Sequence, residues 1–180
     1  MGYDVIVVFG GIAMCFWLLL ICVIGIANGP VGLVVFYEKD VKDRVIQMGL
    51  TTAKDIKRTS VIILFALFIP LITFVPVSVY FYNEAVNGGF VRFWDYFWEL
   101  LGIYMIMNLF DRIFIDEWWV GHTKAWIIPG TEDLMPYIDS ETRKRKWIGT
   151  FIGFPILAFI AAFVLALING PLEFPAFFRL

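Results

Sequence analysis

Long apolar blocks alternate along the chain with short charged segments. Residues 5–37, 59–83 and 147–172 contain no charged side chain. About 20 apolar residues span the roughly 30 Å hydrocarbon layer of a bilayer, so each block is long enough to cross it as a helix. A fourth stretch, residues 90–120, keeps the apolar pattern but includes several acids. The pattern predicts an all-α integral membrane protein with four transmembrane helices.

Basic residues are concentrated in two of the segments that separate the predicted spans. Residues 38–58 hold six Lys and Arg, residues 112–146 hold another six, and only Arg92 and Arg179 lie elsewhere. By the positive-inside rule, we expect both basic segments in the cytoplasm and both termini outside. The prediction is a single membrane domain of residues 1–180, with spans at about 5–28, 60–82, 93–115 and 147–169 and cytoplasmic segments at 31–58 and 116–146.

The first cytoplasmic segment is expected to contain short helices. The Asn-Gly-Pro tripeptide at residues 28–30 predicts a helix end, because Gly often follows a helix and Pro often begins one. Valines and charged residues then alternate in a helical rhythm over residues 31–46, which predicts an amphipathic helix on the membrane surface. Thr52 and Asp55 have the spacing of a capping box at the start of the second span.

Proline and small residues indicate how the spans pack. Pro70 and Pro76 predict kinks in the second span, which membrane helices tolerate when neighbours satisfy the freed carbonyl groups. Small residues recur at four-residue spacing, which allows close helix packing within the chain or in a homo-oligomer formed through the first and fourth spans. These residues are Gly25, Gly29, Gly149, Gly153, Ala158, Ala162 and Ala166.

The third span and its ends hold most of the polar side chains near the predicted membrane. A charge near the bilayer centre costs roughly 2.5–3.5 kcal/mol, so such groups must be paired, face inward or lie near an interface. Spacing predicts an ion pair between Arg92 and Asp95. The four-residue spacing of Arg112 and Asp116 would also allow an ion pair. The full set is Arg92, Asp95, Glu99, Asn108, Asp111, Arg112, Asp116 and Glu117.

The simplest interpretation of these residues is a set of ion pairs near the interfaces, with the Arg112 side chain extending toward cytoplasmic water. Glu99 fits this interpretation least well. Its neighbours are apolar and the nearest basic residue on its helix face, Arg92, is seven positions away. Glu99 is therefore a candidate proton carrier.

The second cytoplasmic segment is expected to form a structured loop around the single histidine, His122. It combines residue types suited to acid–base chemistry or hard-metal binding, but their spacing matches no metal motif, and we predict no metal site. One histidine cannot supply both axial ligands of a bis-histidine haem, and any cofactor stays unknown. A structural role for His122 is the simpler interpretation. The neighbouring charged residues are Asp116, Glu117, Lys124, Glu132 and Asp133.

Three functions are consistent with these features. The first is a transporter or channel for an ion or small solute that uses acidic residues of the third span. The second is a membrane-embedded enzyme acting on a lipid or lipid-linked substrate at the cytoplasmic face, and the third is an accessory subunit of a larger membrane complex. Whether the chain is an enzyme stays open. The candidate site residues are Asp95, Glu99, Asn108, Asp111, Arg112, Asp116, Glu117 and His122.

Partner classes follow from the same pattern. Membrane lipids are expected partners because most of the chain is apolar. Nucleic acid is not expected, since the basic residues are spread over two loops beside membrane helices. Phosphate-binding loops, dinucleotide-binding glycine patterns and serine-centred triads are missing from the sequence, and no pattern is typical of a named family.

Overall fold

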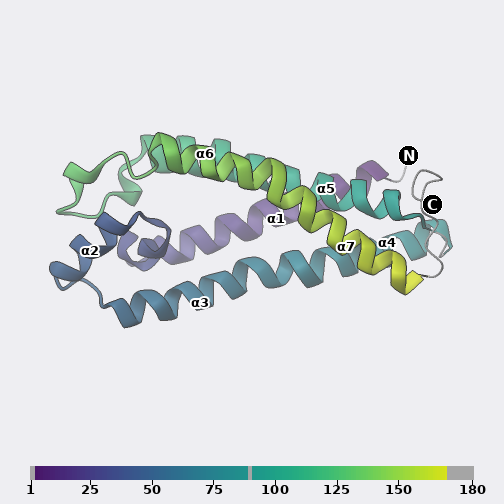
Figure 1. Cartoon of the computed structure of the whole chain (residues 1–180), viewed down its shortest axis with the longest axis horizontal. Coiled ribbons are helices and arrows are strands. Elements are labelled where there is room, and N and C mark those ends of the chain that lie inside the picture. The colour runs from purple at the N-terminus through teal and green to yellow at the C-terminus, as the bar shows by residue number, and fades with distance from the viewer. Residues whose placement is uncertain (1–2, 89–90, 170–180) are drawn as a thin grey trace, which may run out of the picture. The chain divides into compact units, whose positions relative to one another are not determined.

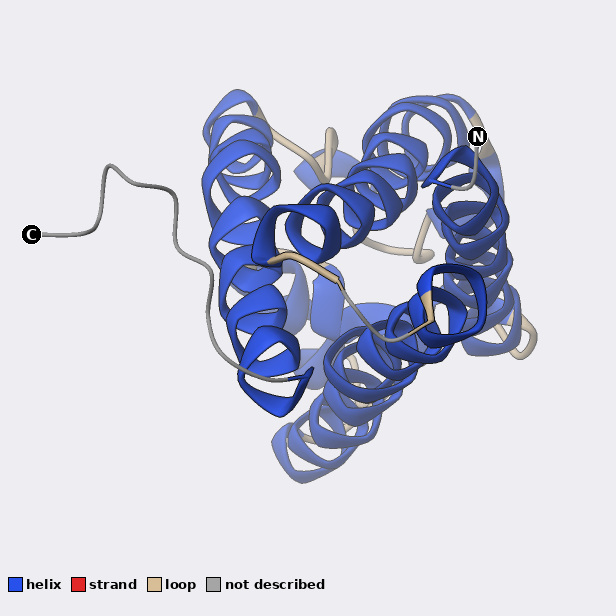
Figure 2. Ribbon diagram, turned by 90° about the vertical axis from the view of Figure 1, so that its right-hand side faces the viewer, coloured by secondary structure: helices blue, strands red, loops and turns tan. Residues whose placement is uncertain are grey.

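The computed structural model describes residues 3–88 and 91–169, and all regular structure within these ranges is helical (Figure 1, Figure 2). The α-helices are α1 (Tyr3–Ile26), α2 (Lys39–Gln47), α3 (Ala53–Ile69), α4 (Val75–Asn87), α5 (Phe93–Phe110), α6 (Ser140–Ile148) and α7 (Phe154–Asn169). Three short elements are 3₁₀ helices, η1 (Pro30–Phe36), η4 (Lys124–Trp126) and η5 (Glu132–Leu134). Three are π-helical, η2 (Pro70–Phe74), η3 (Asp111–Val120) and η6 (Gly149–Gly153). The predicted all-α fold class is confirmed.

Three helical stretches are long and apolar enough to cross a membrane: Val5–Ile26, Ala53–Val86 and Ser140–Asn169. Large apolar side chains on them face outward, and Phe9, Phe65 and Ile168 are 69%, 61% and 65% exposed. Apolar exposure of this kind is typical of a surface that contacts lipid. A fourth helical stretch, residues 93–122, is of similar length but carries six charged residues.

The chain folds into two compact units. Unit 1 contains residues 1–14, 69–108 and 148–180, of which 1–2, 89–90 and 170–180 are outside the described ranges. Unit 2 contains residues 15–68 and 109–147. Each unit has its own buried core.

In unit 1, glycines let α1 and α5 approach closely. A methyl group at Gly11 would lie 2.8 Å from the side chain of Ile106, and one at Gly102 would lie 2.6 Å from Val7. Larger residues at these glycines would therefore force the two backbones apart. Membrane helices associate through such close packing, because in lipid the hydrophobic effect no longer drives helices together.

The predicted small-residue face of the fourth span is used in part within the chain. Ala158, Ala162 and Ala166 of α7 are all buried in unit 1. Gly149 and Gly153 instead face open space, since no atom of the described residues would lie within 4 Å of a methyl group there. The alanine positions therefore pack inside the unit, and homo-oligomerisation through this face stays a prediction.

Pro70 and Pro76, at which kinks are predicted, both lie within the continuous helical stretch Ala53–Val86. Pro70 has no N–H to donate to the carbonyl group of Ala66, four residues earlier. The indole Nε1 of Trp17 on α1 donates to that carbonyl oxygen at 2.9 Å. A side chain from a neighbouring helix thus replaces the missing backbone donor, as apolar surroundings require.

Pro76 leaves a second carbonyl group without a backbone donor, and a side chain of α5 supplies the hydrogen bond instead. In the π turn of η2, the N–H of Val75 bonds to the carbonyl oxygen of Pro70, and the next N–H position belongs to Pro76, which has none. The carbonyl oxygen of Leu71 accepts from the buried Tyr104 hydroxyl at 2.7 Å instead. Tyr104 therefore couples α5 to the π segment.

The first basic segment differs from the single amphipathic helix predicted for residues 31–46. Helix α1 ends at Ile26, and Gly29 adopts a positive φ of 100°, which confirms the predicted break. The segment then forms two helices, η1 and α2, separated by extended backbone at Tyr37 and Glu38. Helix α2 is amphipathic, with Val41 and Val45 buried. The prediction missed the interruption because a periodic pattern of apolar residues does not reveal that the Tyr37 ring is needed in the core.

The start of α3 has the predicted cap. The Thr52 hydroxyl oxygen accepts from the N–H of Asp55 at 3.1 Å, and the hydroxyl donates to the Asp55 carboxylate at 2.7 Å. The residue spacing of the capping box is confirmed, although the carboxylate bonds to the Thr52 hydroxyl rather than to its backbone N–H.

The segment around η4 and η5, which belongs to unit 2, forms the structured loop that the sequence predicts within residues 116–146. Thr131 is the residue before η5, and its buried hydroxyl donates to the carbonyl oxygen of Ile128 at 2.9 Å and lies 2.8 Å from the Tyr137 hydroxyl. Arg44 of α2 holds the loop through Asp133, at 3.1 Å between Nη2 and Oδ2. The hydrogen bond from Arg44 lowers the pKa of the exposed Asp133 carboxyl below its usual range.

The Tyr104 hydroxyl should be needed only while Pro76 is present. We expect Tyr104→Phe to lower the free energy of unfolding by about 1–3 kcal/mol, because it leaves a buried carbonyl group without a donor. In a Pro76→Ala background, which restores a backbone N–H, the same change should cost less than half as much. Reversible unfolding in mixed micelles, followed by circular dichroism for the four chains of this double-mutant cycle, measures both values. Equal costs in the two backgrounds would contradict the compensation.

Candidate functional site

The largest group of paired charges with low exposure lies on η3 in unit 2. Arg112 forms ion pairs with both Asp111 and Asp116. The side chains of Arg112 and Asp116 are only 11% and 10% exposed. In an α-helix residues five apart do not face each other, whereas the i→i+5 bonding of a π-helix brings them to one face. The π winding of η3 therefore allows both acids to reach the same guanidinium group.

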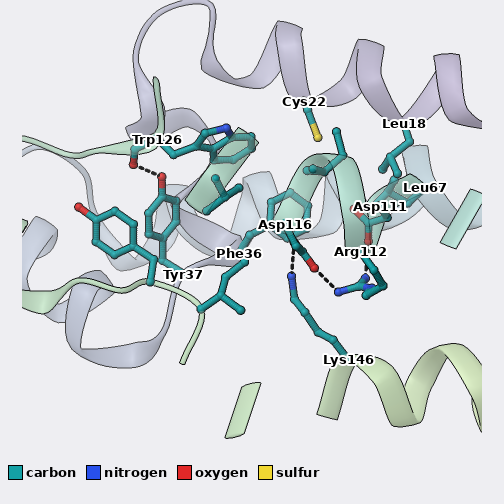
Figure 3. Close-up of a pocket in the computed structure, with 14 residues that line it drawn as sticks. Leu18, Cys22, Phe36, Tyr37, Leu67, Asp111, Arg112, Asp116, Trp126 and Lys146 are labelled. Atoms are coloured by element: carbon teal, nitrogen blue, oxygen red, sulfur yellow. Dashed lines mark hydrogen bonds and ion pairs between the residues drawn. The ribbon is translucent and has the colours of Figure 1, made fainter. Parts of the chain in front are cut away.

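Helix α6 completes this group, which we call the charge cluster: Asp111, Arg112, Asp116 and Lys146. The Lys146 ammonium donates to Oδ1 of Asp116 at 2.7 Å, while Arg112 bonds to Oδ2 of the same carboxylate. Figure 3 shows the two basic side chains meeting at Asp116 from different helices. Asp116 thus connects η3 to α6, and the cluster carries two positive and two negative groups.

The charge cluster forms one wall of a cavity of about 280 Å³. This volume is close to the lower limit of ligand pockets in proteins, roughly 300–1,000 Å³. The rest of the lining is mainly apolar and aromatic, and Figure 3 shows Cys22 pointing from α1 toward it. The other lining residues are Leu18, Cys22, Phe36, Tyr37, Leu67, Ile115, Val120, Trp126, Tyr137 and Ile138.

Contacts among three aromatic residues fix the end of the cavity away from the charge cluster. The Tyr37 hydroxyl donates to the carbonyl oxygen of Trp126 at 2.5 Å, and the Tyr37 ring packs edge-on against Tyr137 with centroids 4.9 Å apart. Burial, with a smaller contribution from Tyr137, raises the pKa of Tyr37 above its usual range. Tyr37 is therefore a neutral hydrogen-bond donor that holds the loop over the cavity.

The charge cluster contains three of the predicted site residues, Asp111, Arg112 and Asp116. The expected extension of Arg112 toward water is wrong, because its guanidinium group is enclosed between two carboxylates. Its Nε is buried without an acceptor among the described residues. The ion pair between Arg112 and Asp116 is the one that the four-residue spacing predicts.

Glu117 and His122 do not line this cavity. Glu117 forms an ion pair of 2.9 Å with Arg143, and both side chains are well exposed. His122 is exposed, and its Nδ1 lies 2.7 Å from the carbonyl oxygen of Glu117 in its own helix. Of the five candidate site residues from Asp111 to His122, only Asp111, Arg112 and Asp116 therefore meet at this cavity. Within residues 3–88 and 91–169, no three His, Cys, Asp or Glu side chains form a group that would hold a metal.

The remaining candidates belong to unit 1. Asp95 pairs with Arg92 at 3.1 Å, as its spacing predicts. The side-chain amide of Asn108 donates to the carbonyl oxygen of Tyr104 at 2.9 Å and its oxygen accepts from Thr150 at 3.4 Å. Asn108 is thus a buried packing residue with partners on α5 and η6.

Glu99 is almost completely buried in unit 1. One carboxyl oxygen, Oε2, accepts from the amide of the equally buried Asn83 on α4 at 2.5 Å. The other oxygen, Oε1, is enclosed and has no donor in the described part of the chain. The spacing of charges on α5 alone does not predict the partner, since Asn83 lies on another helix.

Sequence patterns did not single out Lys146, Cys22 and Asn83 as site residues. Lys146 is one of a run of four basic residues that the topology already explains, and Cys22 lies in an apolar helix where packing is the expected role. Asn83 is the last residue of the second uncharged block and has no special spacing. Their importance comes from neighbours distant in sequence.

The chain matches no protein-family model, no curated protein and no solved structure.

Proposed function

We propose that the chain is an integral membrane protein with four transmembrane helices, both termini outside and both basic segments in the cytoplasm. Three helical stretches support this by length and composition. The charges of the fourth stretch are compatible with crossing because each has a partner in its own unit: Asp95 pairs with Arg92, Glu99 bonds to Asn83, and Asp111 pairs with Arg112.

We further propose that the protein binds a small amphipathic molecule in the cavity of unit 2, at the level of the cytoplasmic headgroups. The observation that carries this proposal is a cavity of about 280 Å³ with an apolar lining and the charge cluster on one wall. Apolar walls with a few convergent polar groups are typical of ligand sites. Binding, rather than catalysis, is proposed because both acids of the cluster are engaged in ion pairs and His122 lies outside the cavity.

Transport of an ion or small solute is the second candidate. Glu99 favours it, because a buried carboxyl group with one oxygen lacking a donor among the described residues is costly in a membrane unless it serves a function. In this proposal Glu99 carries a proton or cation and Asn83 holds its other oxygen. An accessory role in a larger complex, and a homo-oligomer, stay predictions.

The proposed topology places residues 86 and 140 on opposite sides of the membrane. In a chain whose two cysteines are replaced by serine, Val86→Cys should react with a membrane-impermeant maleimide in intact cells. Ser140→Cys should react only after permeabilisation; both native side chains are exposed. Labelling of both cysteines from the same side would overturn the crossing by residues 93–122.

Filling the cavity should abolish amphiphile binding. We expect the wild-type chain, released from micelles containing mixed phospholipids, to retain one lipid in native mass spectrometry. Cys22→Phe places a ring in the cavity and should reduce the retained fraction by about tenfold, which corresponds to 1.4 kcal/mol of binding free energy.

Cys15→Phe is the matched control, because Cys15 lies on the same helix but does not line the cavity. It should retain lipid as the wild type does. Equal retention by both variants, with helical content unchanged in each, would exclude the cavity as the binding site.

A proton-carrying Glu99 predicts a loss of flux on neutralisation. Wild-type protein in liposomes should dissipate an imposed pH gradient, and Glu99→Gln should slow this at least tenfold. Asp95→Asn should have little effect, because that carboxylate is already occupied by Arg92. Fluorescence of an entrapped pH-sensitive dye gives the rates. If the wild-type chain moves no more protons than empty liposomes, the transport candidate is wrong.

A further inference from the structure

The charge cluster has a composition that constrains its ligand. It contains two positive groups, Arg112 and Lys146, and two negative groups, Asp111 and Asp116. We infer that the cavity of unit 2 binds a zwitterionic amphiphile, whose phosphate or carboxylate lies against Arg112 and Lys146 and whose ammonium group lies against the two aspartates. This inference rests on the proposed binding function and names its ligand class.

The balance of charges argues for a ligand without net charge. A charged group transferred into weakly polar surroundings is stable only when it is paired and hydrogen-bonded. An anionic headgroup would bring a third negative group to a wall that holds two positive ones, and a cationic headgroup would create the opposite excess. A zwitterion exchanges ion pairs for ion pairs and leaves no charge uncompensated.

The geometry identifies the group that yields to the ligand. Lys146 is 32% exposed, against 11% for Arg112, and its flexible stem carries a compact ammonium group that bonds to one oxygen of Asp116. Arg112 is held by two carboxylates at once. A ligand therefore enters by displacing Lys146 from Asp116: Lys146 then binds the anionic group and Asp116 accepts from the ammonium group.

The donors of the ligand also follow from the cluster. Carboxylates are acceptors only, so Asp116 and Asp111 need N–H donors from the ligand. A primary ammonium group supplies three donors, whereas a trimethylated ammonium group supplies none. The apolar lining, including Leu18, Phe36 and Leu67, favours an attached hydrocarbon chain. The structure therefore favours a headgroup of the phosphoethanolamine type on a lipid over the same headgroup in water.

The test compares phospholipids with one acyl composition and different headgroups. Wild-type protein is released from micelles that contain equal amounts of phosphatidylethanolamine, phosphatidylcholine and phosphatidylglycerol, and native mass spectrometry measures which lipid stays bound. We expect phosphatidylethanolamine to exceed each of the others by about tenfold. Addition of soluble phosphoethanolamine at the same concentration should displace little of it, because the apolar part is missing.

Two single substitutions should change this preference in opposite directions. Asp116→Asn gives the wall an excess positive charge and should shift binding to phosphatidylglycerol. Lys146→Gln gives it an excess negative charge, should weaken phosphatidylglycerol binding further, and should favour a lipid with a cationic primary ammonium headgroup. Glu117→Gln and Lys144→Gln are matched controls, since they change the same total charge at neighbouring residues that do not line the cavity. They should leave the preference unchanged.

The possible outcomes separate this inference from the proposed function. A stable lipid adduct that is lost in Cys22→Phe but prefers phosphatidylglycerol would sustain amphiphile binding and overturn the zwitterion. A preference for phosphatidylcholine, which is also zwitterionic, would overturn the primary ammonium group as the donor to the aspartates. If the control variants shift the headgroup preference as much as the cluster variants do, the zwitterion is likewise overturned while amphiphile binding is sustained. If no lipid is retained by the wild-type chain, both proposals fail. Displacement by soluble phosphoethanolamine at equal concentration would overturn the lipid as the source of the headgroup.

Discussion

Charges that are removed from water must be balanced within the chain, and Asp116 is where unit 2 meets this requirement. Its two oxygens accept from Arg112 on η3 and from Lys146 on α6, two elements that are far apart in sequence. Removing one partner of a buried ion pair is far more costly than removing an exposed one, because the remaining charge stays uncompensated. The exposed pair of Glu117 and Arg143 lies on the same two elements and carries no such constraint. The enclosed carboxylate therefore determines how η3 and α6 pack.

The same requirement governs the backbone. Proline removes a donor from a helix, and in apolar surroundings no water replaces it. The freed carbonyl groups of Ala66 and Leu71 accept from Trp17 and Tyr104, two aromatic side chains that each bring a polar atom on an apolar body. The two bonds lie in different units, so each unit compensates one proline by a contact of its own. Proline in these helices is thus compensated by tertiary contacts. Its position determines which carbonyl group needs a donor from a tyrosine or tryptophan on another helix.

Sequence patterns predict those features that depend on near neighbours. The break before Pro30, the cap at Thr52 and the pairing of Arg92 with Asp95 all follow from spacings of four residues or fewer. The bond between Glu99 and Asn83 joins two helices, and no local rule fixes which residues of two helices face each other. The proposed fourth crossing shows the limit of such patterns most clearly. Composition alone cannot tell whether the acids of residues 93–122 are paired, and only their partners make a membrane position reasonable for them.

The π winding of η3 explains why the cluster is neutral. Apolar periodicity cannot reveal such a segment, because it assumes 3.6 residues per turn. In a regular α-helix Asp111 and Asp116 would point to different sides, and only Asp116, four residues from Arg112, would remain within easy reach of it. Arg112 and Lys146 would then face a single carboxylate, and the wall would carry an excess positive charge that attracts anions. With π winding the second carboxylate joins the wall, so the charge balance on which the zwitterion preference depends is set by the backbone as much as by the residues present.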